Sequence, residues 1–550
     1  MDQSHNNTTE VLIVGAGPTG LMMACQLAMH QVSFRIIDKN ITSSQNSGAL
    51  IVQARTLEIF EQMGIADEAI SQGIVADRVS ILYNGKKIAF TSIKNIGRNL
   101  SQFPFLLMLE QSNTEKLLLK FIRTRGHSVE RGVQFKSFVQ DKDGTTTTVV
   151  MPDASDQIIK SKYIIAADGS NSSIRNFLGI PFKGKTYSKP IFILDCEAIS
   201  ELSPGVISFA FSRSSVAGFF PLQHGRWRVD GTFPKRLKKS KTIPIETITD
   251  GFRYWNNLNF TIHNTEWFSV SRSHQKYART IRVGNCFLAG DSAHVHTPVG
   301  AQGMNTGLQD AHNLAWKMAF VLRQNAKPEL LDTYSTDRVG VSRGFAHYSD
   351  AVFKFATRTN IVTKLFRTFM LKVFFKKIFP KFENNEKSRL KFFESISQIG
   401  IQYKPGFHSD KNSIGQFLQS APKPGHRFPY IDFVQNNKDT NSHKIIDNTG
   451  FTLLVLAEEF TTEIKIIAQK YSLKLILIKH LPETGKIYAR LGITKTGFYL
   501  IRPDMYIELR SSTSETENLS RYLQLMLIVH QEIKLRPKSE KHQLATGGFV

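Results

Sequence analysis

Short apolar runs alternate with a helix-forming stretch over the first forty residues. Residues 10–20 read EVLIVGAGPTG, an apolar run that ends in glycines, and the helix-forming stretch LMMACQLAMH follows. A second apolar run, SFRIID, completes the pattern. Apolar runs of this length indicate buried strands, and the whole segment predicts one strand–helix–strand unit of about 30 residues.

Helical and strand-like patterns continue in separate blocks along the chain. The segments 53–65, 109–126 and 307–323 have the composition and periodicity of helices. Alternating polar and apolar positions from about 130 to 165 predict β-hairpins. Residues 186–272 are rich in β-branched and aromatic side chains, which predicts a second, sheet-like domain.

A basic helical segment follows these blocks. Between 346 and 400, apolar pairs recur about every four residues, with lysines and arginines between them. The pattern predicts a helix with a cationic face over 354–379. We interpret it as a helix that covers the core, with weak contact to an anionic membrane surface as the alternative. Proline and glycine at 405–406 and 422–425 mark a linker, after which strand-like and helical stretches alternate again.

The composition narrows the class of protein. A chain of 550 residues suggests about three domains. Its three cysteines lie far apart, so we expect neither a disulfide framework nor a zinc site, and a reducing cytoplasm fits best. The net charge of +24 attracts anions, but it is mostly spread out and no nucleic-acid-binding signature accompanies it. We expect no signal peptide and no membrane span, because the start is polar and the apolar runs are short.

The first motif that carries chemistry is GAGPTG, from Gly15 to Gly20. Gly15 permits a tight turn, Gly17 leaves room for a phosphate against the backbone, and Gly20 lets the following helix pack on the strand. The helix begins at Pro18 and Thr19, where backbone N–H groups and partial positive charge favour a pyrophosphate.

The end of the next strand supports the same interpretation. Asp38 stands there, followed by Lys39, and a carboxylate at this place can accept hydrogen bonds from ribose hydroxyls. The strand, turn, helix and carboxylate together predict a dinucleotide site. This motif alone does not distinguish NAD from FAD.

Two further motifs identify the cofactor through a family resemblance. Asp168-Gly169 follows the apolar run YIIAA and continues to Ser172 and Arg175, while Gly290-Asp291 follows CFLA and leads into PVGAQGMN. The three motifs, in this order, resemble those of the class A flavoprotein aromatic hydroxylases. The phenol hydroxylase, pentachlorophenol monooxygenase and hydroxyphenylpropionate hydroxylase group is the most similar. The resemblance extends over nearly the whole chain.

The resemblance implies an α/β fold in which a Rossmann-type FAD-binding domain is interleaved with a β-sheet substrate domain. A C-terminal thioredoxin-like domain follows, whose final strand and turn match GFYLIRPD at 497–504. It lacks CxxC, which excludes thiol redox chemistry there, and relatives use it for structure or dimerisation, so a homodimer is one implied assembly. The implied boundaries are 8–185 and 276–345 for the two parts of the FAD-binding domain, 186–275 for the substrate domain, 346–414 for a helical segment and 415–550 for the thioredoxin-like domain.

The same resemblance implies FAD as the cofactor, with NADPH or NADH as co-substrate. Asp291 would hold the ribityl chain, Gln111 would touch the FAD, and Arg55 would lie near the pyrophosphate. Backbone N–H groups of the loop 298–305 would stabilise negative charge on reduced flavin. Asp168 would support both flavin and nicotinamide. The predicted FAD contacts are Gly15, Gly17, Pro18, Thr19, Gly20, Asp38, Lys39, Arg55, Gln111, Asp168, Asp291, Pro298, Gly300, Gly303, Met304 and Asn305.

The implied activity is hydroxylation of a small aromatic, phenolic substrate with O2 through a flavin C4a-hydroperoxide. One alternative is a flavin monooxygenase that acts on a polycyclic or antibiotic-like substrate. The other is an FAD-containing membrane-surface or partner-binding protein without turnover. Oxidation of NADPH that an aromatic compound stimulates would discriminate between turnover and its absence.

The substrate pocket is expected between the flavin and the sheet domain. No catalytic residue is assigned, because the stretch SGALIVQ lacks the aspartate of phenol hydroxylases. Gly48 stands where many relatives carry an arginine near the flavin or its phosphates, a departure that bears on flavin mobility or NADPH entry. No metal is expected, since His294 and His296 lack further ligands. The candidate lining is Phe209, Phe211, Phe219, Phe220 and Pro221, with Arg213 and His224 placed to polarise a substrate oxygen.

Overall fold

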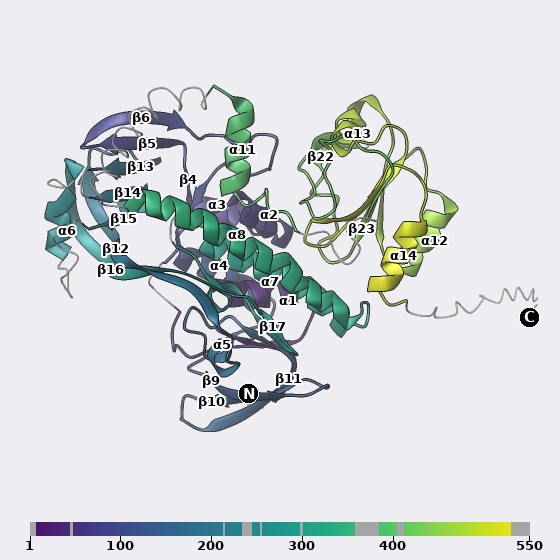
Figure 1. The fold of residues 1–550 in the computed structure, drawn as a ribbon, viewed down its shortest axis with the longest axis horizontal. Coiled ribbons are helices and arrows are strands. Elements are labelled where there is room, and N and C mark those ends of the chain that lie inside the picture. Colours follow the sequence, from purple (N-terminus) through teal and green to yellow (C-terminus); the bar gives the residue numbers. More distant parts are fainter. Residues whose placement is uncertain are drawn as a thin grey trace, which may run out of the picture.

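Three main β-sheets with their helices make up the protein in the computed structural model (Figure 1). The second sheet lies on one side of the helices of the first unit, and the C-terminal unit lies on the other. The structure describes residues 7–43, 48–212, 215–233, 245–252, 256–297, 301–357, 384–403, 412–435 and 437–529.

The first sheet confirms the predicted strand–helix–strand unit. Strand β1 (Thr8–Val14), helix α1 (Pro18–Met29) and strand β2 (Phe34–Asp38) follow one another, and the two strands pair in parallel. On its other edge β1 pairs in parallel with β11 (Asp156–Ala166), which pairs with β18 (Cys286–Leu288). The remaining strands of this sheet are β8 (Val129–Arg131), β9 (Gln134–Gln140), β10 (Thr145–Val150) and β17 (Arg282–Val283).

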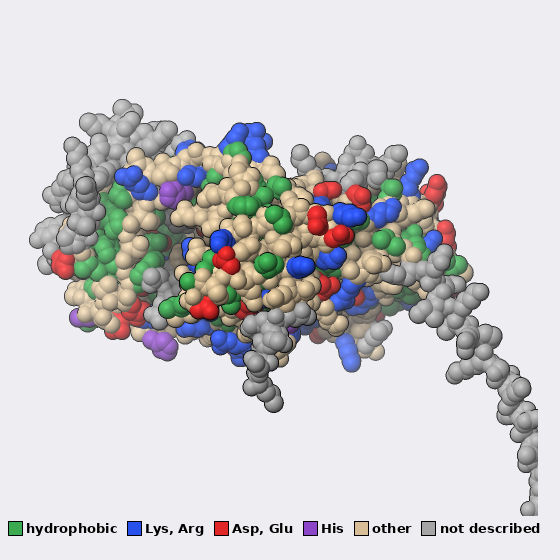
Figure 2. Space-filling view, turned by 90° about the horizontal axis from the view of Figure 1, so that it is seen from below, with side chains coloured by type: hydrophobic (Ala, Val, Ile, Leu, Met, Phe, Trp, Pro, Cys, Tyr) green, Lys and Arg blue, Asp and Glu red, His purple; other side chains and the backbone are tan. Residues whose placement is uncertain are grey.

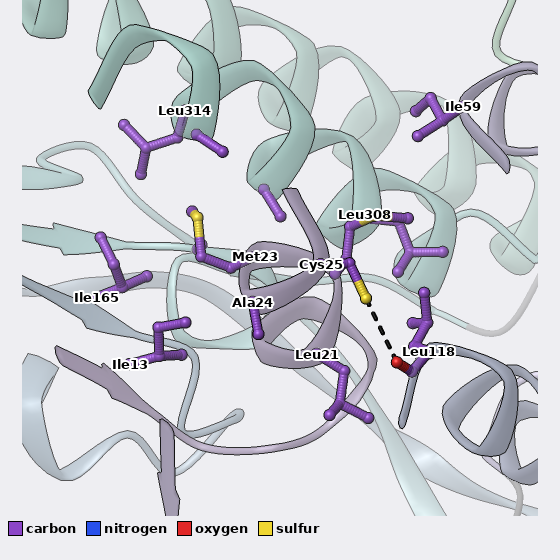
Figure 3. Close-up of a cluster of buried hydrophobic side chains, with 14 of the residues drawn as sticks. Ile13, Leu21, Met23, Ala24, Cys25, Ile59, Leu118, Ile165, Leu308 and Leu314 are labelled. Atoms are coloured by element: carbon purple, nitrogen blue, oxygen red, sulfur yellow. Dashed lines mark hydrogen bonds between the residues drawn. The ribbon is translucent and has the colours of Figure 1, made fainter. Parts of the chain in front are cut away.

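Helix α1 is buried because it lies between this sheet and two other helices. Figure 3 shows it between the strand residues Ile13 and Ile165 and the side chain of Leu308 on α7 (Gly303–Leu322). The thiol of Cys25 donates to the carbonyl oxygen of Leu118 on α4 (Gln111–Arg123), at 3.4 Å. Since helices cover it, a parallel sheet of this kind has continuous apolar runs, which the sequence shows.

The second sheet has eight strands in the order β19-β16-β12-β15-β14-β13-β5-β6. Its two longest strands pair with each other in antiparallel fashion. The strands are β5 (Arg78–Tyr83), β6 (Lys86–Ser92), β12 (Phe182–Ser200), β13 (Val206–Phe211), β14 (Val216–Pro221), β15 (Arg226–Thr232), β16 (Phe260–Ala278) and β19 (His294–Val295). Strands β5 and β6 come from the part of the chain that sequence patterns place in the first domain.

The two faces of this sheet have different neighbours. One face, called here the outer face, carries Phe219, Trp227 and Val229, which pack with Phe260 and with residues of α6 (Ile245–Gly251). The opposite, inner face carries Ile207, Phe209, Phe220 and Leu222, which pack against the core of the first unit. Because side chains alternate along a strand, the inner face is the one turned toward the first unit.

The C-terminal unit has its own sheet, in the order β20-β26-β25-β23-β24. A buried ion pair and a buried hydrogen bond join it to the first unit, since Arg502 contacts Asp337 of helix α8 (Asp332–Thr357) at 3.0 Å and Asn313 of α7 donates to Asp504. Its elements are β20 (Ser413–Ile414), β23 (Thr452–Leu456), α12 (Thr462–Lys470), β24 (Lys474–Ile478), α13 (Gly485–Leu491), β25 (Gly497–Ile501), β26 (Ile507–Ser511) and α14 (Glu517–Met526).

Helical elements between the two units include α8 (Asp332–Thr357) and α11 (Glu386–Ile396). Most of the predicted basic helix at 354–379 lies outside the described residues. Among the described helices, none has both the length and the apolar character that a membrane span needs. On the face in Figure 2, lysine and arginine side chains are interspersed with acidic ones instead of forming one patch.

All three cysteine thiols are expected to be unreactive in the folded protein. Cys25, Cys196 and Cys286 are buried, and desolvation raises the pKa of each thiol, that of Cys196 to about 12. A disulfide reagent at pH 8 should therefore label none in native protein and all three in guanidinium chloride. Labelling of one thiol under native conditions would contradict this and indicate local opening around that residue.

Candidate cofactor site

Packing of the glycine-rich turn after β1 follows the spacing of its glycines. Gly15 has a φ of +104°, and a Cβ there would lie 2.3 Å from the carbonyl oxygen of Ala167. A Cβ at Gly20 would lie 1.9 Å from the carbonyl oxygen of Gly15. At Gly17, by contrast, a Cβ would meet nothing within 4 Å. Two glycines are therefore required by contacts within the protein, while Gly17 faces open space.

The N-terminus of α1 is suited to an anion. No side chain caps it, and Pro18 occupies the first turn, so the orphan N–H groups of Thr19 and Gly20 have no side-chain acceptor at the cap. A phosphate next to Gly17 would meet these donors and the positive end of the helix.

Asp38 fixes the loop on which that phosphate would rest. Its carboxylate accepts hydrogen bonds from the backbone N–H of Ala16 at 2.7 Å and of Asn40 at 2.8 Å. Arg131 lies 3.8 Å from the same carboxylate, and Lys39 beside it is exposed. A carboxylate oxygen has more than one lone pair, so Asp38 keeps capacity for a ribose hydroxyl.

Ser292 joins the second and third motifs. Its hydroxyl donates to Asp168 at 2.9 Å and accepts from the backbone N–H of Gly169 at 3.1 Å. The other oxygen of Asp168 accepts from the backbone N–H of Ser173. Arg175 donates to the carbonyl oxygen of Ser292 at 3.0 Å, so the two motifs form one hydrogen-bonded unit.

Replacing Ser292 with alanine should lower the free energy of unfolding by about 1–2 kcal/mol, because it removes two partly buried hydrogen bonds. FAD affinity should fall with it, since Asp168 and the turn at Gly290 lose their link. Urea unfolding and FAD titration measure the two effects. The control is Ser71→Ala, whose hydroxyl is on the surface. An unchanged FAD affinity in Ser292→Ala would separate this serine from the cofactor site.

The first and third motifs also meet. A Cβ added at either Gly290 or Gly307 would lie only 2.3 Å from the hydroxyl oxygen of Thr19, so Thr19 packs directly against both glycines. Asp291 follows with an exposed carboxylate, yet desolvation by the protein around it raises its pKa. An accessible carboxylate of this kind can accept hydrogen bonds from the hydroxyl groups of a polyol.

Asp310 on α7 is the buried anion that holds this third motif. It accepts from the backbone N–H of Gly290 at 2.9 Å and contacts His294 and Arg338, each at 2.6 Å. Despite the burial, these partners hold the pKa of Asp310 well below its ordinary value. His296 lies next to His294, and burial lowers the pKa of His296 to about 3.

Other predicted contacts have structural partners. Arg55 is fully buried and donates to Glu58 and to the carbonyl oxygen of Asp504 in the C-terminal unit, and its predicted FAD contact remains a prediction. Gln111 accepts from the backbone N–H of Ala49 at 3.0 Å, at the N-terminus of α4. Asn305 accepts from the hydroxyl of Thr56 and donates to the carbonyl oxygen of Ile51.

The flavin-loop prediction is only partly within the described residues. Gly303 begins α7, and Met304 follows it against the core. Pro298 and Gly300 lie outside the described residues, so their predicted FAD contacts remain predictions.

The predicted pocket lining divides between the two faces of the second sheet. Phe209 and Phe220 lie on the inner face with rings 5.8 Å apart, and Phe211 has the same parity on β13. Phe219 and Pro221 lie on the outer face, which corrects the prediction for them: an aromatic cluster in sequence does not show which way each side chain points. His224 is exposed at the end of the β14–β15 turn, and Arg213 lies outside the described residues.

Sequence reasoning missed a row of charged residues on the inner face. Arg226, Arg228 and Asp230 alternate along β15, separated by Trp227 and Val229 on the outer face. The sequence RWRVD at 226–230 already shows this alternation, which is typical of a strand with one charged face. Asp310 could not be found in this way, since its helix has no sequence signal that predicts a buried carboxylate.

A dinucleotide-binding α/β protein with an aromatic sheet face turned toward its cofactor unit is the class that this fold and site define. The open space at Gly17, the uncapped helix and the Asp291 carboxylate are chemically suited to the phosphates and hydroxyl groups of a dinucleotide such as FAD.

Comparison with known proteins agrees with this class. Residues 8–348 match the FAD binding domain family. The chain is 28% identical over 540 residues to 6-methylpretetramide 4-monooxygenase of Streptomyces rimosus, covering 95% of this chain and 94% of that protein. It is 26% identical over 541 residues to pentachlorophenol 4-monooxygenase of Sphingobium chlorophenolicum, covering 94% and 96%. The solved complex of aklavinone-11 hydroxylase with FAD and aklavinone has the same fold, with a TM-score of 0.77, 20% identity and coverage of 96% and 99%.

The chain belongs to the FAD binding domain family and is an FAD-dependent monooxygenase, an oxidoreductase. The resemblance to the class A aromatic hydroxylases and the prediction of FAD as cofactor are thereby confirmed.

Proposed function

We propose that this protein uses FAD, NADPH or NADH, and O2 to hydroxylate an aromatic substrate that carries a hydroxyl group. One observation carries the proposal. Arg228, on the inner face of the second sheet, donates to the carbonyl oxygen of Ala49 at 3.3 Å, and the N–H of Ala49 donates to Gln111. Ala49 therefore links Arg228 on the aromatic inner face to Gln111, which is a predicted FAD contact.

The residues divide the work in the proposed reaction. Gly15, Gly17 and Gly20 with the N-terminus of α1 bind the pyrophosphate, and Asp291 orients the ribityl chain. The chemistry that bound FAD would supply there is hydride acceptance from the nicotinamide and oxygen transfer from O2 to the substrate ring. Phe209 and Phe220 offer apolar surface that positions an aromatic ring and excludes water from it.

Two substrate sizes are consistent with this site. Relatives named for pentachlorophenol and for 6-methylpretetramide both align over nearly the full chain at similar identity. A phenol and a polycyclic phenol share an electron-rich ring and a hydroxyl, which is the chemistry we propose this site recognises. The proposal therefore commits to a hydroxylated aromatic ring and leaves its size to experiment.

For the C-terminal unit we propose a thioredoxin-like fold without redox activity. Strands β23 and β24 pair in parallel, and β25 pairs in antiparallel fashion with both β23 and β26, with helices from α12 to α14 alongside. Every cysteine of the chain lies before residue 415, so no thiol pair can act there. The buried contact of Asp504 with Arg55 supports a structural role for this unit.

Oxidation of NADPH and NADH by the FAD-loaded protein, measured with a panel of monocyclic and polycyclic phenols, tests the function. We expect one class of phenol to stimulate oxidation and oxygen uptake and to yield a product heavier by one oxygen atom. A Gly17→Ala variant without FAD is the control. Bound FAD with no stimulation by any aromatic compound would overturn the proposal.

A further inference from the structure

Asp230 is the last of three alternating charged residues on the inner face of β15. Its side chain has the same parity as Arg226 and Arg228, both of which contact the first unit. The residues between them, Trp227 and Val229, belong to the outer cluster. Because side chains alternate along a strand, the Asp230 carboxylate lies on the inner face, in line with Arg226 and Arg228.

The other two charges of this row are paired. Arg226 contacts Glu110 at 2.7 Å and Glu266 at 2.8 Å. Arg228 makes two hydrogen bonds to Asp195, at 2.7 and 2.6 Å, and a third to the carbonyl oxygen of Ala49. Their donors are thus committed to partners within the protein.

Asp230 differs from both. Its Oδ1 atom is buried and, in the described part of the chain, accepts no hydrogen bond. Desolvation raises the pKa of this carboxyl to about 6. Two charged groups face it: Arg228 lowers the pKa, and Asp195 raises it. A buried polar atom without a partner costs about 1–3 kcal/mol, so an unpaired carboxylate on this face calls for a functional explanation.

The cross-strand neighbours of Asp230 are uncharged, and two aromatic rings lie close by. Opposite it stand Gly218 on β14 and Ile193 on β12. Gly218 has no side chain, and a Cβ there would lie 2.9 Å from the ring of Phe220 and 3.3 Å from that of Phe209. The carboxylate thus stands beside a glycine and two aromatic rings, on the face where we place the substrate.

We propose that Asp230 accepts a hydrogen bond from a hydroxyl group of the aromatic substrate and takes its proton as the ring is hydroxylated. The inference rests on the proposed function. The O–H bond of the substrate breaks, its electron pair stays on the oxygen and raises electron density in the ring, and the proton forms an O–H bond on Asp230. The proton on Asp230 passes to solvent after the product leaves. A carboxylate only accepts hydrogen bonds, and neighbouring Arg228 disfavours a cation, so a neutral hydroxyl is the donor that fits.

Binding of 2-naphthol and of its methyl ether, 2-methoxynaphthalene, tests this role without turnover. Both compounds present the same rings to the FAD-loaded protein, and perturbation of the flavin absorbance reports their binding. We expect wild type to bind the naphthol roughly tenfold more tightly than the ether, because only the naphthol can donate a hydrogen bond to a charged acceptor. The preference should weaken as the pH falls through about 6, where Asp230 takes up a proton.

Three variants isolate Asp230 from its surroundings. Asp230→Leu removes both carboxylate oxygens, so it should bind both compounds within a factor of about two. Asp230→Asn, the variant closest in shape, should lose the pH dependence of the preference. The control Ile193→Val changes the opposite residue on the same face without altering a polar atom, so it should keep both the preference and its pH dependence.

The possible failures are distinguishable. An unchanged preference for naphthol in both Asp230 variants would overturn the role of Asp230 and leave the proposed function intact. If neither compound perturbs the flavin spectrum of wild type and no phenol stimulates NADPH oxidation, the aromatic substrate itself is wrong, and the role of Asp230 with it.

Discussion

Replacing Gly17 with alanine should weaken FAD binding by about 100-fold, or about 2.7 kcal/mol, while leaving the free protein as stable as wild type. A Cβ at this position meets nothing within 4 Å in the protein, and the backbone at φ −76° and ψ −175° is open to any residue. The same Cβ would project where a pyrophosphate must approach the N-terminus of α1. The variant thus affects the bound state and spares the free one.

Gly20→Ala is the matched control for this prediction. Its Cβ would lie 1.9 Å from the carbonyl oxygen of Gly15, so it should lower the free energy of unfolding of the free protein by about 1–3 kcal/mol. FAD titration and thermal unfolding of the FAD-free protein measure both variants. Tight FAD binding by Gly17→Ala would show that the pyrophosphate does not rest on this turn.

Replacing Asp310 with asparagine should lower the free energy of unfolding by about 3–5 kcal/mol. The carboxylate is buried, and the change leaves the Arg338 guanidinium without its charged partner. The backbone N–H of Gly290 also loses a charged acceptor, so the turn that presents Asp291 should loosen and FAD affinity should fall. Urea unfolding and FAD titration test the two consequences.

The pH dependence gives this prediction a second test. The pKa of Asp310 in the folded protein lies below its ordinary value of 3.8, so its contribution to stability is present above about pH 4 and is lost as the pH falls below that. The stability difference between wild type and Asp310→Asn should therefore shrink in acid. Asp156→Asn, at an exposed ion pair with Lys136, is the control and should cost less than about 0.5 kcal/mol. Equal losses in the two variants would refute the role assigned to Asp310.

Local sequence patterns predicted the parts of the fold that depend on neighbouring residues. The turn from Gly15 to Gly20 was predictable because contacts within a few residues or with the adjacent strand require Gly15 and Gly20. The helices α1, α4 and α7 were predictable from periodicity, and so was the strand–turn pattern before Asp168 and before Asp291.

Features that depend on distant parts of the chain were not predictable. Strand β5 joins the second sheet by pairing in parallel with β13, more than a hundred residues later, and no local pattern encodes that partner. Arg55 contacts Asp504, about 450 residues later in the C-terminal unit, and no local pattern predicts that partner. Phe219 faces outward because the register of β14 sets its direction, and a one-residue shift would reverse it.

The discontinuity of the first unit has a consequence for synthesis of the protein. Strand β18 completes the first sheet and helix α7 covers α1, but the ribosome makes them only after every strand of the second sheet except the short β19. Until then Thr19 lacks Gly290 and Gly307 as neighbours, and Asp168 lacks Ser292. A nascent chain that ends before residue 286 is therefore expected to hold an unfinished nucleotide fold, and the cofactor can be captured only once translation has passed α7.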